Sequence, residues 1–289
     1  MNSSRRNFTI ITLGLALLAG CSRGKDDQRI VLGFSQIGAE SEWRTANTQS
    51  IKSAAATMGI DLRFSDAQQK QENQIKAIRS FIAQKVDVIA FSPVVETGWD
   101  TVLKEAHDAK IPVILTDRSV TSDPSLYVGF IGSDFVEEGR RAGRWAVEHF
   151  KDVSGDVNIV ELQGTVGAGP AIDRKKGFEE IIASHPNFKI IRSQSGEFTR
   201  AKGKEVMEAF LKGETRKIHL LFAHNDDMAI GAIQAIEEAG LKPGSDIAIV
   251  SVDAVKDVVA GKPIPKRIVT EESVFPKETA AQVLPTRKY

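Results

Sequence analysis

The sequence predicts an α/β protein of two lobes, each lobe a parallel sheet flanked by helices. The main observation is an alternation of short apolar, β-branched runs with amphipathic segments of about 10 to 16 residues, which is typical of right-handed βαβ units. A second observation is a pause in this alternation at residues 126–132, which are apolar without a helical period. The alternation then restarts, so we expect two lobes that join near residues 129–133.

The composition excludes some classes of function. The chain has 289 residues with 38 basic and 38 acidic side chains, and 42% of its residues are hydrophobic, enough for a sizeable core. Proteins that bind nucleic acid usually carry a basic surplus, so we expect no nucleic-acid partner. The five histidines lack the spacing of metal ligands, and we expect neither a metal nor a cofactor.

The first residues predict an export signal instead of part of the fold. Arg5 and Arg6 precede an apolar run at residues 10–18 that is too short to span a bilayer. Residues 4–8, Ser-Arg-Arg-Asn-Phe, also resemble a twin-arginine signal. No later segment is apolar for long enough to cross a membrane. We therefore expect export to the periplasm or the cell envelope.

The signal ends in a candidate lipidation site. Residues 18–21, Leu-Ala-Gly-Cys, form the pattern of a bacterial lipoprotein cleavage box, in which small residues precede a thiol that can carry lipid. We expect residues 1–21 to be the signal, Cys21 to be the lipidated first residue of the mature chain, and residues 22–29 to be a polar tether. Cys21 is the only cysteine, which excludes a disulfide within the chain.

The first lobe is expected at residues 30–130. Its first helix carries Ile51, Ala54, Ala55 and Met58 on one face, and Gly59 ends that helix in the position that favours glycine. Strands are expected at 30–35, 62–66, 86–91 and 111–119, and helices at 43–58, around Ile75, Ile78 and Ile82, and at 99–109.

The second lobe is expected at residues 131–254. Asp134, with Glu137 three residues later, is typical of an N-cap, and it starts a helix that runs to Phe150. Gly240 ends the last helix, whose buried stripe is expected to be Ala229, Ala232, Ile233 and Ile236. Strands are expected at 157–162, 188–193, 218–223 and 247–252, and further helices at 171–184, 200–212 and 226–239.

Charged and polar side chains follow the strands of both lobes. In an open α/β sheet, ligands bind beyond the carboxyl ends of the strands, so these side chains are expected to share one rim. Asp117 and Arg118 lie side by side at the end of the strand expected at residues 111–119. The others are Ser35, Gln36, Glu40, Trp43 and Arg44 from the first lobe, and Gln163, Asp173, Arg174, Glu197, Phe198, Arg200, His224 to Asp227 and Asp253 from the second.

These residue types suit a neutral polyol, above all a monosaccharide. Carboxylates accept hydrogen bonds and guanidinium groups donate them in a fixed fork, so together they can hold vicinal hydroxyls. Trp43 and Phe198 could cover the apolar faces of a sugar ring. Alternatives remain open for single residues, because Arg44, Arg200 and Asp226 could be helix-terminal charges. Trp43 could be a core residue, and Ser35 and Gln36 could simply end a strand.

Several motifs resemble the periplasmic sugar-binding proteins of ABC importers, in the ribose/galactose-type group and especially its galactofuranose-binding branch. The resemblance runs from about residue 30 to residue 253. The motifs that carry it are GFSQIG at 33–38, Trp43-Arg44, QQKQENQ at 68–74, Asp117-Arg118-Ser119, ELQGTVG at 161–167, DRKKG at 173–177 and HNDD at 224–227.

This resemblance implies a periplasmic clamshell that holds a sugar between its lobes and delivers it to an ABC permease by hinge closure. It further implies a protein that is not an enzyme, and we expect a monomer. The implied sugar contacts are Ser35, Glu40, Trp43, Arg44, Asp117, Arg118, Asp173, Arg174, Asn225 and Asp253, with Phe198 as a stacking aromatic of the wider group.

The C-terminal part departs from that family. After Asp253 the family's chain runs through a helix, a strand with another polar ligand contact, a second hinge crossing and a helix of the first lobe. Here residues 255–257 are followed by residues 258–263, which resemble the far C-terminal end. We expect residues 255–289 to be a shortened segment that returns to the first lobe, lacking about thirty to forty residues. Loss of a hinge strand would weaken the coupling of the lobes and expose apolar surface, so a family member that no longer binds is one alternative.

Some features of the sequence are also compatible with other functions. The glycines of residues 164–169 loosely match a dinucleotide loop, but their spacing is Gly-x-x-Gly-x-Gly. A glycosidase would need paired carboxylates, for which Asp117, Asp173 and Asp253 are candidates, but each has a base or an amide as neighbour. A sugar-responsive regulator would need a helix-turn-helix where the signal lies. A sensor for a chemoreceptor or a kinase uses the same two lobes, and the sequence does not separate it from an importer.

Overall fold

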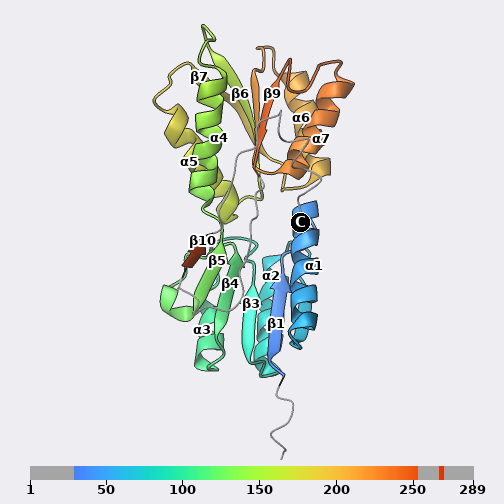
Figure 1. The fold of residues 1–289 in the computed structure, drawn as a ribbon, viewed down its shortest axis with the longest axis vertical. Helices are drawn as coiled ribbons and strands as arrows, with labels where there is room; N and C mark the ends of the chain where they lie inside the picture. Colours follow the sequence, from blue (N-terminus) through green and yellow to red (C-terminus); the bar gives the residue numbers. More distant parts are fainter. Residues whose placement is uncertain (1–28, 253–266, 270–289) are drawn as a thin grey trace, which may run out of the picture.

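The computed structural model describes residues 29–252 and the backbone of residues 267–269. These residues form two lobes stacked along the long axis of the molecule (Figure 1). The proposed signal with Cys21, most of the tether, Asp253 and most of the C-terminal segment lie outside the described residues. The expected strands and helices are present in order, with ends that shift by one or two residues.

The first lobe is a sheet of parallel strands in the order β10-β5-β4-β3-β1-β2. Strand β5 belongs to this sheet, so the chain crosses to the second lobe after Gly132, two residues later than the expected boundary. The strands are β1 (Val31–Gln36), β2 (Asp61–Asp66), β3 (Val88–Phe91), β4 (Val113–Asp117), β5 (Gly129–Gly132) and β10 (Arg267–Val269). The helices are α1 (Glu42–Thr57), α2 (Gln71–Ala83), α3 (Asp100–Asp108) and the 3₁₀ turn η1 (Pro124–Leu126).

Helices α2 and α3 cover one face of this sheet with a closed core. Side chains of alternate strand residues, among them Phe91 and Leu115, pack there against Phe81 and Trp99, and all four are buried. Gly33 permits the approach of α2, because a Cβ at this position would lie 2.5 Å from the ring of Phe81.

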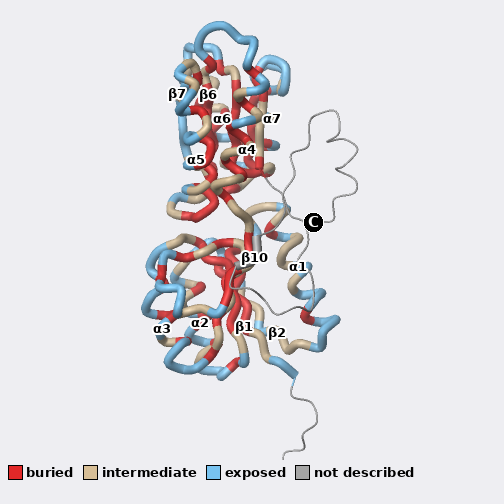
Figure 2. The backbone as a smooth tube through the Cα atoms, turned by 60° about the vertical axis from the view of Figure 1, so that its left-hand side comes forward, coloured by how far each residue is buried: buried red, intermediate tan, exposed pale blue. Residues whose placement is uncertain are grey.

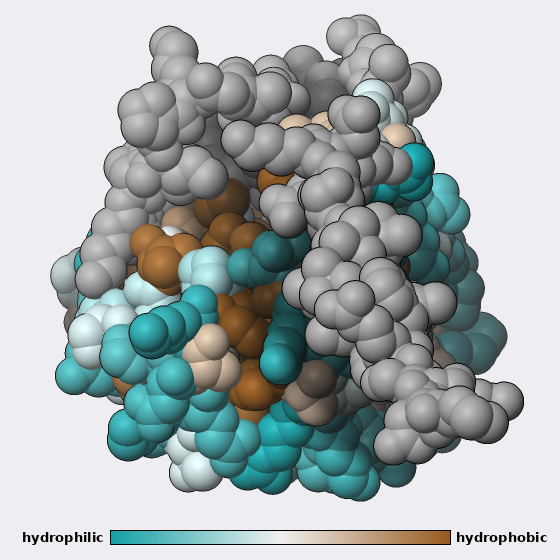
Figure 3. Space-filling view, turned by 90° about the horizontal axis from the view of Figure 1, so that it is seen from below, coloured by the Kyte–Doolittle hydropathy of each residue, from teal (hydrophilic) through white to brown (hydrophobic). Residues whose placement is uncertain are grey.

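Helix α1 covers only part of the opposite face. Its predicted apolar stripe is half wrong, since Ala55 is buried but Ala54 is exposed and Met58 is 71% exposed. The reason is that α1 lies at one edge, over β2, and has few described neighbours beyond that strand (Figure 1). The central residues Leu32, Val88, Ile114 and Ile131 of this face remain half-buried. Seen from below, apolar side chains lie in a hollow among hydrophilic ones (Figure 3).

The second lobe is covered on both faces. Its parallel sheet has the order β7-β6-β8-β9, and one buried cluster lies under α4 and α5 while another lies under α6 and α7. Burial is therefore nearly continuous along the central strands β6 and β8, whereas the edge strand β7 is largely half-buried or exposed (Figure 2). The strands are β6 (Val157–Gln163), β7 (Phe188–Ser195), β8 (Leu220–Ala223) and β9 (Ala248–Ser251), and the helices are α4 (Phe135–His149), α5 (Gly169–Ile182), α6 (Arg200–Gly213) and α7 (Asp226–Glu238).

Two glycines set the spacing between α4 and α5. A Cβ at Gly139 would lie 2.0 Å from the carbonyl oxygen of Arg174, and one at Gly177 would lie 1.9 Å from that of Val136. Any larger residue would force the helices apart. This close approach fixes the first turn of α4 beside the first turns of α5.

The described part of the C-terminal segment lies in the first lobe. Strand β10 pairs in parallel with β5, with Arg267 opposite Phe130 and Val269 opposite Gly132. The rest of residues 253–289, on which the expected loss of a hinge strand depends, lies outside the described residues. Among the described residues, no helix combines the length and the apolar character that a membrane span requires.

Candidate functional site

A cleft lies between the carboxyl ends of the two sheets. Eight predicted site residues line it, and they come from both lobes. These are Glu40, Trp43, Arg44, Asp117, Arg118, Arg174, Phe198 and Asn225. These residues come together because the strand ends of each parallel sheet meet at one rim.

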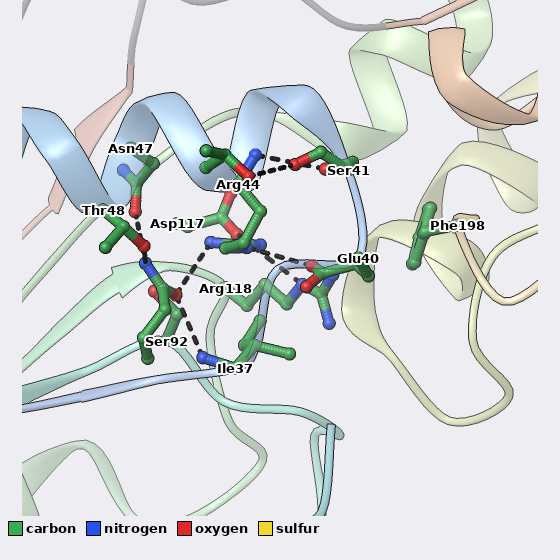
Figure 4. Close-up of polar contacts among 12 residues, drawn as sticks. Ile37, Glu40, Ser41, Arg44, Asn47, Thr48, Ser92, Asp117, Arg118 and Phe198 are labelled. Carbon is green, nitrogen blue, oxygen red and sulfur yellow. Dashed lines mark hydrogen bonds and ion pairs between the residues drawn. The ribbon is translucent and has the colours of Figure 1, made fainter. Parts of the chain in front are cut away.

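Arg44 organises the first-lobe side of the cleft. Its Nη2 donates to Asp117 Oδ2 at 2.6 Å and its Nε donates to Glu40 Oε1 at 3.0 Å (Figure 4). The guanidinium also lies 4.6 Å from the ring centre of Trp43. Burial lowers the pKa of Arg44, but the carboxylates of Asp117 and Glu40 outweigh it and hold the pKa above its ordinary value. Arg44 is 2% exposed, so it is a cleft residue and not a solvated helix-terminal charge.

The backbone of Asp117 turns its carboxylate into the cleft. Its φ is +63°, a left-handed conformation that aspartate tolerates better than most residues. Gly132 on the neighbouring strand makes room for the turn, since a Cβ there would lie 2.3 Å from the carbonyl oxygen of Asp117. The acid after the apolar strand is thus held by local geometry.

Arg118 is a buried cation between the lobes. Its Nη1 donates to the carbonyl of Val94 at 3.1 Å, and its guanidinium lies 5.1 Å from the ring centre of Phe198 in the second lobe. Its Nε has no hydrogen-bond partner in the described part of the chain, although Asp117 Oδ2 lies 3.6 Å away. Burial, and then the nearby charge of Arg44, lower the pKa of Arg118 to about 10.

The second lobe contributes Arg174 from α5. Its Nε donates to Glu138 Oε2 at 2.5 Å, and its Nη1 donates to the carbonyl of His224. The guanidinium also lies 5.1 Å from the ring centre of Phe135. Arg174 is therefore fixed by α4 and by the end of β8 together.

Phe198 is held in the cleft by a strained backbone. Its φ is +61°, which is costly for a bulky residue. A Cβ at Gly164 would lie 1.9 Å from the ring, so only glycine fits beneath it. Asn225 donates to the carbonyl of Phe198 at 3.0 Å and accepts from Met228 N as the N-cap of α7.

Two of the predicted sugar contacts, Ser35 and Asp173, do not line the described cleft, and the structure does not test a third, Asp253. Ser35 is fully buried and its Oγ has no hydrogen-bond partner among residues 29–252; it lies on the strand face that α2 covers, as Gly33 does, because side chains alternate along a strand. Asp173 lies next to Arg174 on α5 and acts on Glu96 of the first lobe, whose pKa is raised by burial and by the Asp173 charge. Asp253 lies outside the described residues.

Sequence reasoning missed five residues that line the cleft: Ser41, Ser133, Phe135, Glu138 and Pro170. Ser41 was detectable, because it is the N-cap of α1 and accepts from Arg44 N. Ser133 and Phe135 flank the predicted N-cap Asp134, where the chain crosses from the first lobe to the second. Their place at this crossing could have predicted that they line the cleft between the lobes. Glu138 follows Glu137, and the pair is indistinguishable in sequence from ordinary acids at a helix start.

The charges around the cleft balance. Three carboxylates and three guanidinium groups line it among the described residues, so the formal charge is zero. They are Glu40, Asp117 and Glu138 against Arg44, Arg118 and Arg174. The cavity that these side chains enclose measures about 30 Å³, room for one or two waters. A ligand as large as a sugar enters only when the lobes move apart.

Direct contacts join the lobes on both sides of the cleft. On one side, the backbone N–H of Glu42 donates to Asp227 Oδ2 at 2.9 Å, and Arg200 holds the other oxygen of Asp227 at 2.8 Å. On the other side, the backbone N–H of Glu96 donates to the carbonyl of Gly167 at 3.0 Å. The structure therefore has the lobes closed on each other. Arg200 takes part through Asp227 and not as a cleft residue.

A buried ionic network supports the floor of the second lobe. Glu161 Oε1 lies 2.9 Å from His224 Nε2, and Glu161 Oε2 lies 3.0 Å from Lys175 Nζ and accepts from Ser193 Oγ. Burial raises the pKa of Glu161, but these partners outweigh it and lower the pKa to about 2. Burial lowers the pKa of His224. The network fixes the carbonyl of His224 that Arg174 holds.

No group of histidine, cysteine, aspartate and glutamate residues in the described ranges could hold a metal ion. The cleft is lined by side chains that offer groups for hydrogen bonding and for aromatic contact. Its donor and acceptor groups come from paired side chains, with an aromatic ring from each lobe.

Known proteins are similar to this chain over most of its length. The family model of the periplasmic binding protein domain matches residues 32–261. The galactofuranose-binding protein YtfQ of Escherichia coli K12 is 60% identical over 233 residues, which are 79% of this chain and 72% of that protein.

Two solved structures are also similar. One is a protein from Mycobacterium smegmatis in complex with β-D-fucofuranose, with a TM-score of 0.85 and 54% identity over 90% of this chain and 95% of that one. The other is the binding protein of the arabinose ABC transporter from Shewanella sp. ANA-3 bound to L-arabinofuranose, with a TM-score of 0.83 and 51% identity over 89% and 95%.

Proposed function

We propose that this chain, which belongs to the periplasmic binding protein family, captures a monosaccharide in its cleft and delivers it to an ABC permease. The observation that carries the proposal is the convergence of three carboxylates, three guanidinium groups and an aromatic ring from each lobe on one cavity of zero formal charge. Such a set supplies acceptors and donors in equal measure, as vicinal hydroxyls require. A phosphorylated or acidic sugar would instead need a surplus of cations.

Hydroxyl groups would also complete the hydrogen bonding of the closed cleft. Glu40 Oε2, Glu138 Oε1 and Arg118 Nε are buried without a hydrogen-bond partner in the described part of the chain, and each such atom costs about 1–3 kcal/mol. A hydroxyl donates to a carboxylate and accepts from a guanidinium. A form that closes around the sugar would therefore bind it more tightly than an open form, and this difference drives hinge closure.

We propose a furanose as the ligand, with galactofuranose first among the candidates. The support is that the similar proteins reported above bind galactofuranose, fucofuranose and arabinofuranose. We propose binding without catalysis, because the matched relatives are binding proteins and each cleft acid that accepts a hydrogen bond accepts it from an arginine. We further propose a lipid anchor at Cys21 on the outer side of the cytoplasmic membrane and a monomeric mature chain.

Calorimetry with three sugars tests the proposal. The furanose ring of galactose closes through O4 and the pyranose ring through O5, so 5-deoxy-D-galactose forms only furanose and 4-deoxy-D-galactose forms only pyranose. The mature chain should bind D-galactose and 5-deoxy-D-galactose but not 4-deoxy-D-galactose. If only 4-deoxy-D-galactose binds, the ligand is a pyranose and not a furanose. Failure of these sugars and of L-arabinose, D-fructose and D-ribose would reject sugar binding and favour a chain that the C-terminal departure has disabled.

A growth experiment tests delivery to a permease. A strain without this protein should lose growth on the bound sugar at low concentration and recover it when the gene is restored. A strain that still grows but no longer responds to the sugar by chemotaxis or gene induction would show a sensor instead of an importer.

A further inference from the structure

We propose that Glu138 is a specificity-determining residue that accepts a hydrogen bond directly from one sugar hydroxyl. The inference rests on the proposed function and adds a contact that the sequence motifs did not include. Glu138 lies in the first turn of α4, is 3% exposed and lines the cleft.

The two oxygens of Glu138 have different surroundings. Oε2 accepts from Arg174 Nε at 2.5 Å, whereas Oε1 is buried without a hydrogen-bond partner in the described part of the chain. Buried polar atoms in folded proteins nearly always have a partner. Because Glu138 borders the cleft, a ligand hydroxyl can supply the missing donor. One carboxylate would then orient Arg174 and bind the sugar at the same time.

The neighbouring acid shows that this position is not an ordinary helix start. Glu137 is more exposed and forms ion pairs with Arg144 and Arg141 on the surface of α4. The two glutamates lie one residue apart and therefore point in directions that differ by about 100° around the helix. Only Glu138 faces the cleft, and Glu137 provides a matched control of the same chemistry.

The position of Glu138 is rigid. The contacts of Gly139 and Gly177 with the facing backbone hold α4 against α5, and Arg174 is itself held by the carbonyl of His224. Glu138 cannot withdraw when its partner hydroxyl is missing. A preorganised acceptor of this kind discriminates against a ligand without the donor, by about ten- to a hundredfold for a bond to a charged group.

The test is a double-mutant cycle between the protein and the sugar. The proteins are the wild type, Glu138→Gln, Glu138→Asp and the control Glu137→Gln. The ligands are D-galactose, its 2-, 3-, 5- and 6-deoxy analogues and 1,4-anhydro-D-galactitol, which together remove each free hydroxyl of the furanose in turn. Each ligand meets every protein in the same ring equilibrium, so differences between rings cancel in the cycle.

We expect one analogue to lose about ten- to a hundredfold in affinity for the wild type and for Glu137→Gln. For Glu138→Gln and Glu138→Asp the same analogue should bind about as well as D-galactose. If the Glu138 variants instead bind D-galactose and every analogue more weakly than the wild type by the same factor, the inference is overturned. Glu138 would then only position Arg174. If the wild type binds no D-galactose at all, the proposed galactose ligand fails together with the inference. Circular dichroism confirms that each variant is folded.

Discussion

Arg118→Ala should weaken sugar binding by about ten- to a hundredfold and leave the ligand-free fold almost unchanged. The burial of Arg118 and the charge of Arg44 lower its pKa from its ordinary value to about 10, an electrostatic penalty of up to about 3 kcal/mol for the charged form. Removing the side chain relieves this penalty but leaves the carbonyl of Val94 without its donor, at a cost of about 1–3 kcal/mol. The two effects nearly cancel, so the melting temperature without sugar should change by only a few degrees.

The effect on binding should be much larger. A hydrogen bond from a charged group is worth about 1.5–3 kcal/mol, so affinity should fall by about ten- to a hundredfold. At a sugar concentration of 100 Kd, ligand stabilises the wild type by about 2.7 kcal/mol, a shift in melting temperature of about 5–10 °C. With an affinity a hundredfold weaker, the same sugar should stabilise the variant by about 0.4 kcal/mol, a shift of about 1 °C.

Differential scanning fluorimetry with and without D-galactose measures both effects. Arg79→Ala is the control, because Arg79 is half exposed and pairs with Glu105 at 2.8 Å on the outer helices. It should keep the full sugar-dependent shift. If Arg118→Ala shows the same sugar-dependent shift in melting temperature as the wild type, the reasoning is refuted. A ligand-free melting temperature more than about 10 °C lower would show that the penalty on the buried cation was misjudged.

Three further predictions concern the cleft glycine, the lobe contact and the buried network. Gly164→Ala places a Cβ 1.9 Å from the ring of Phe198, which lines the cleft, and should weaken sugar binding about tenfold. The control Gly213→Ala, whose Cβ meets nothing within 4 Å, should bind sugar as the wild type does. Equal affinities of the two variants in calorimetry would contradict the prediction. Asp227→Ala removes the acceptor for the backbone N–H of Glu42 in the other lobe and should reduce the affinity for sugar about tenfold. Small-angle scattering at subsaturating sugar should show a larger radius of gyration than for the wild type. An unchanged radius of gyration and affinity would show that this contact does not favour closure. The carboxylate of Glu161 has a pKa lowered from 4.5 to about 2, so its stabilisation is complete above pH 4.5 and is lost as the pH falls toward 2. Urea unfolding should show a loss of up to about 3 kcal/mol over this range, and Glu161→Gln should lose clearly less; identical pH profiles would refute the assignment.

Local patterns predicted the elements of this fold well. Strands and helices are encoded in short runs of residues, so the alternation of apolar segments located each expected element within one or two residues, although β5, β10 and η1 were not expected as elements. The exception is α1, whose apolar stripe predicts burial at Met58. Burial of a helix face depends on what packs against it, and the sequence of α1 does not contain that partner.

The sequence alone determined which strand ends carry the chemistry, because covalent position fixes Asp117 as the last residue of β4 and Arg118 as the next residue. It did not determine side-chain direction. Asp173 and Arg174 are neighbours on α5, and only Arg174 lines the cleft, since successive helical residues point about 100° apart. The phase of α5 is set by its packing on α4.

Only the tertiary structure brought Glu138 to the cleft. In sequence it is an ordinary acid near a helix start, and its role depends on Gly139 and Gly177, which let two helices approach until backbone meets backbone. That approach is a property of two segments some forty residues apart along the chain and not of either alone. The sequence therefore supplied the groups that meet a ligand, whereas the packing of α4 on α5 decided which buried oxygen is left to meet it.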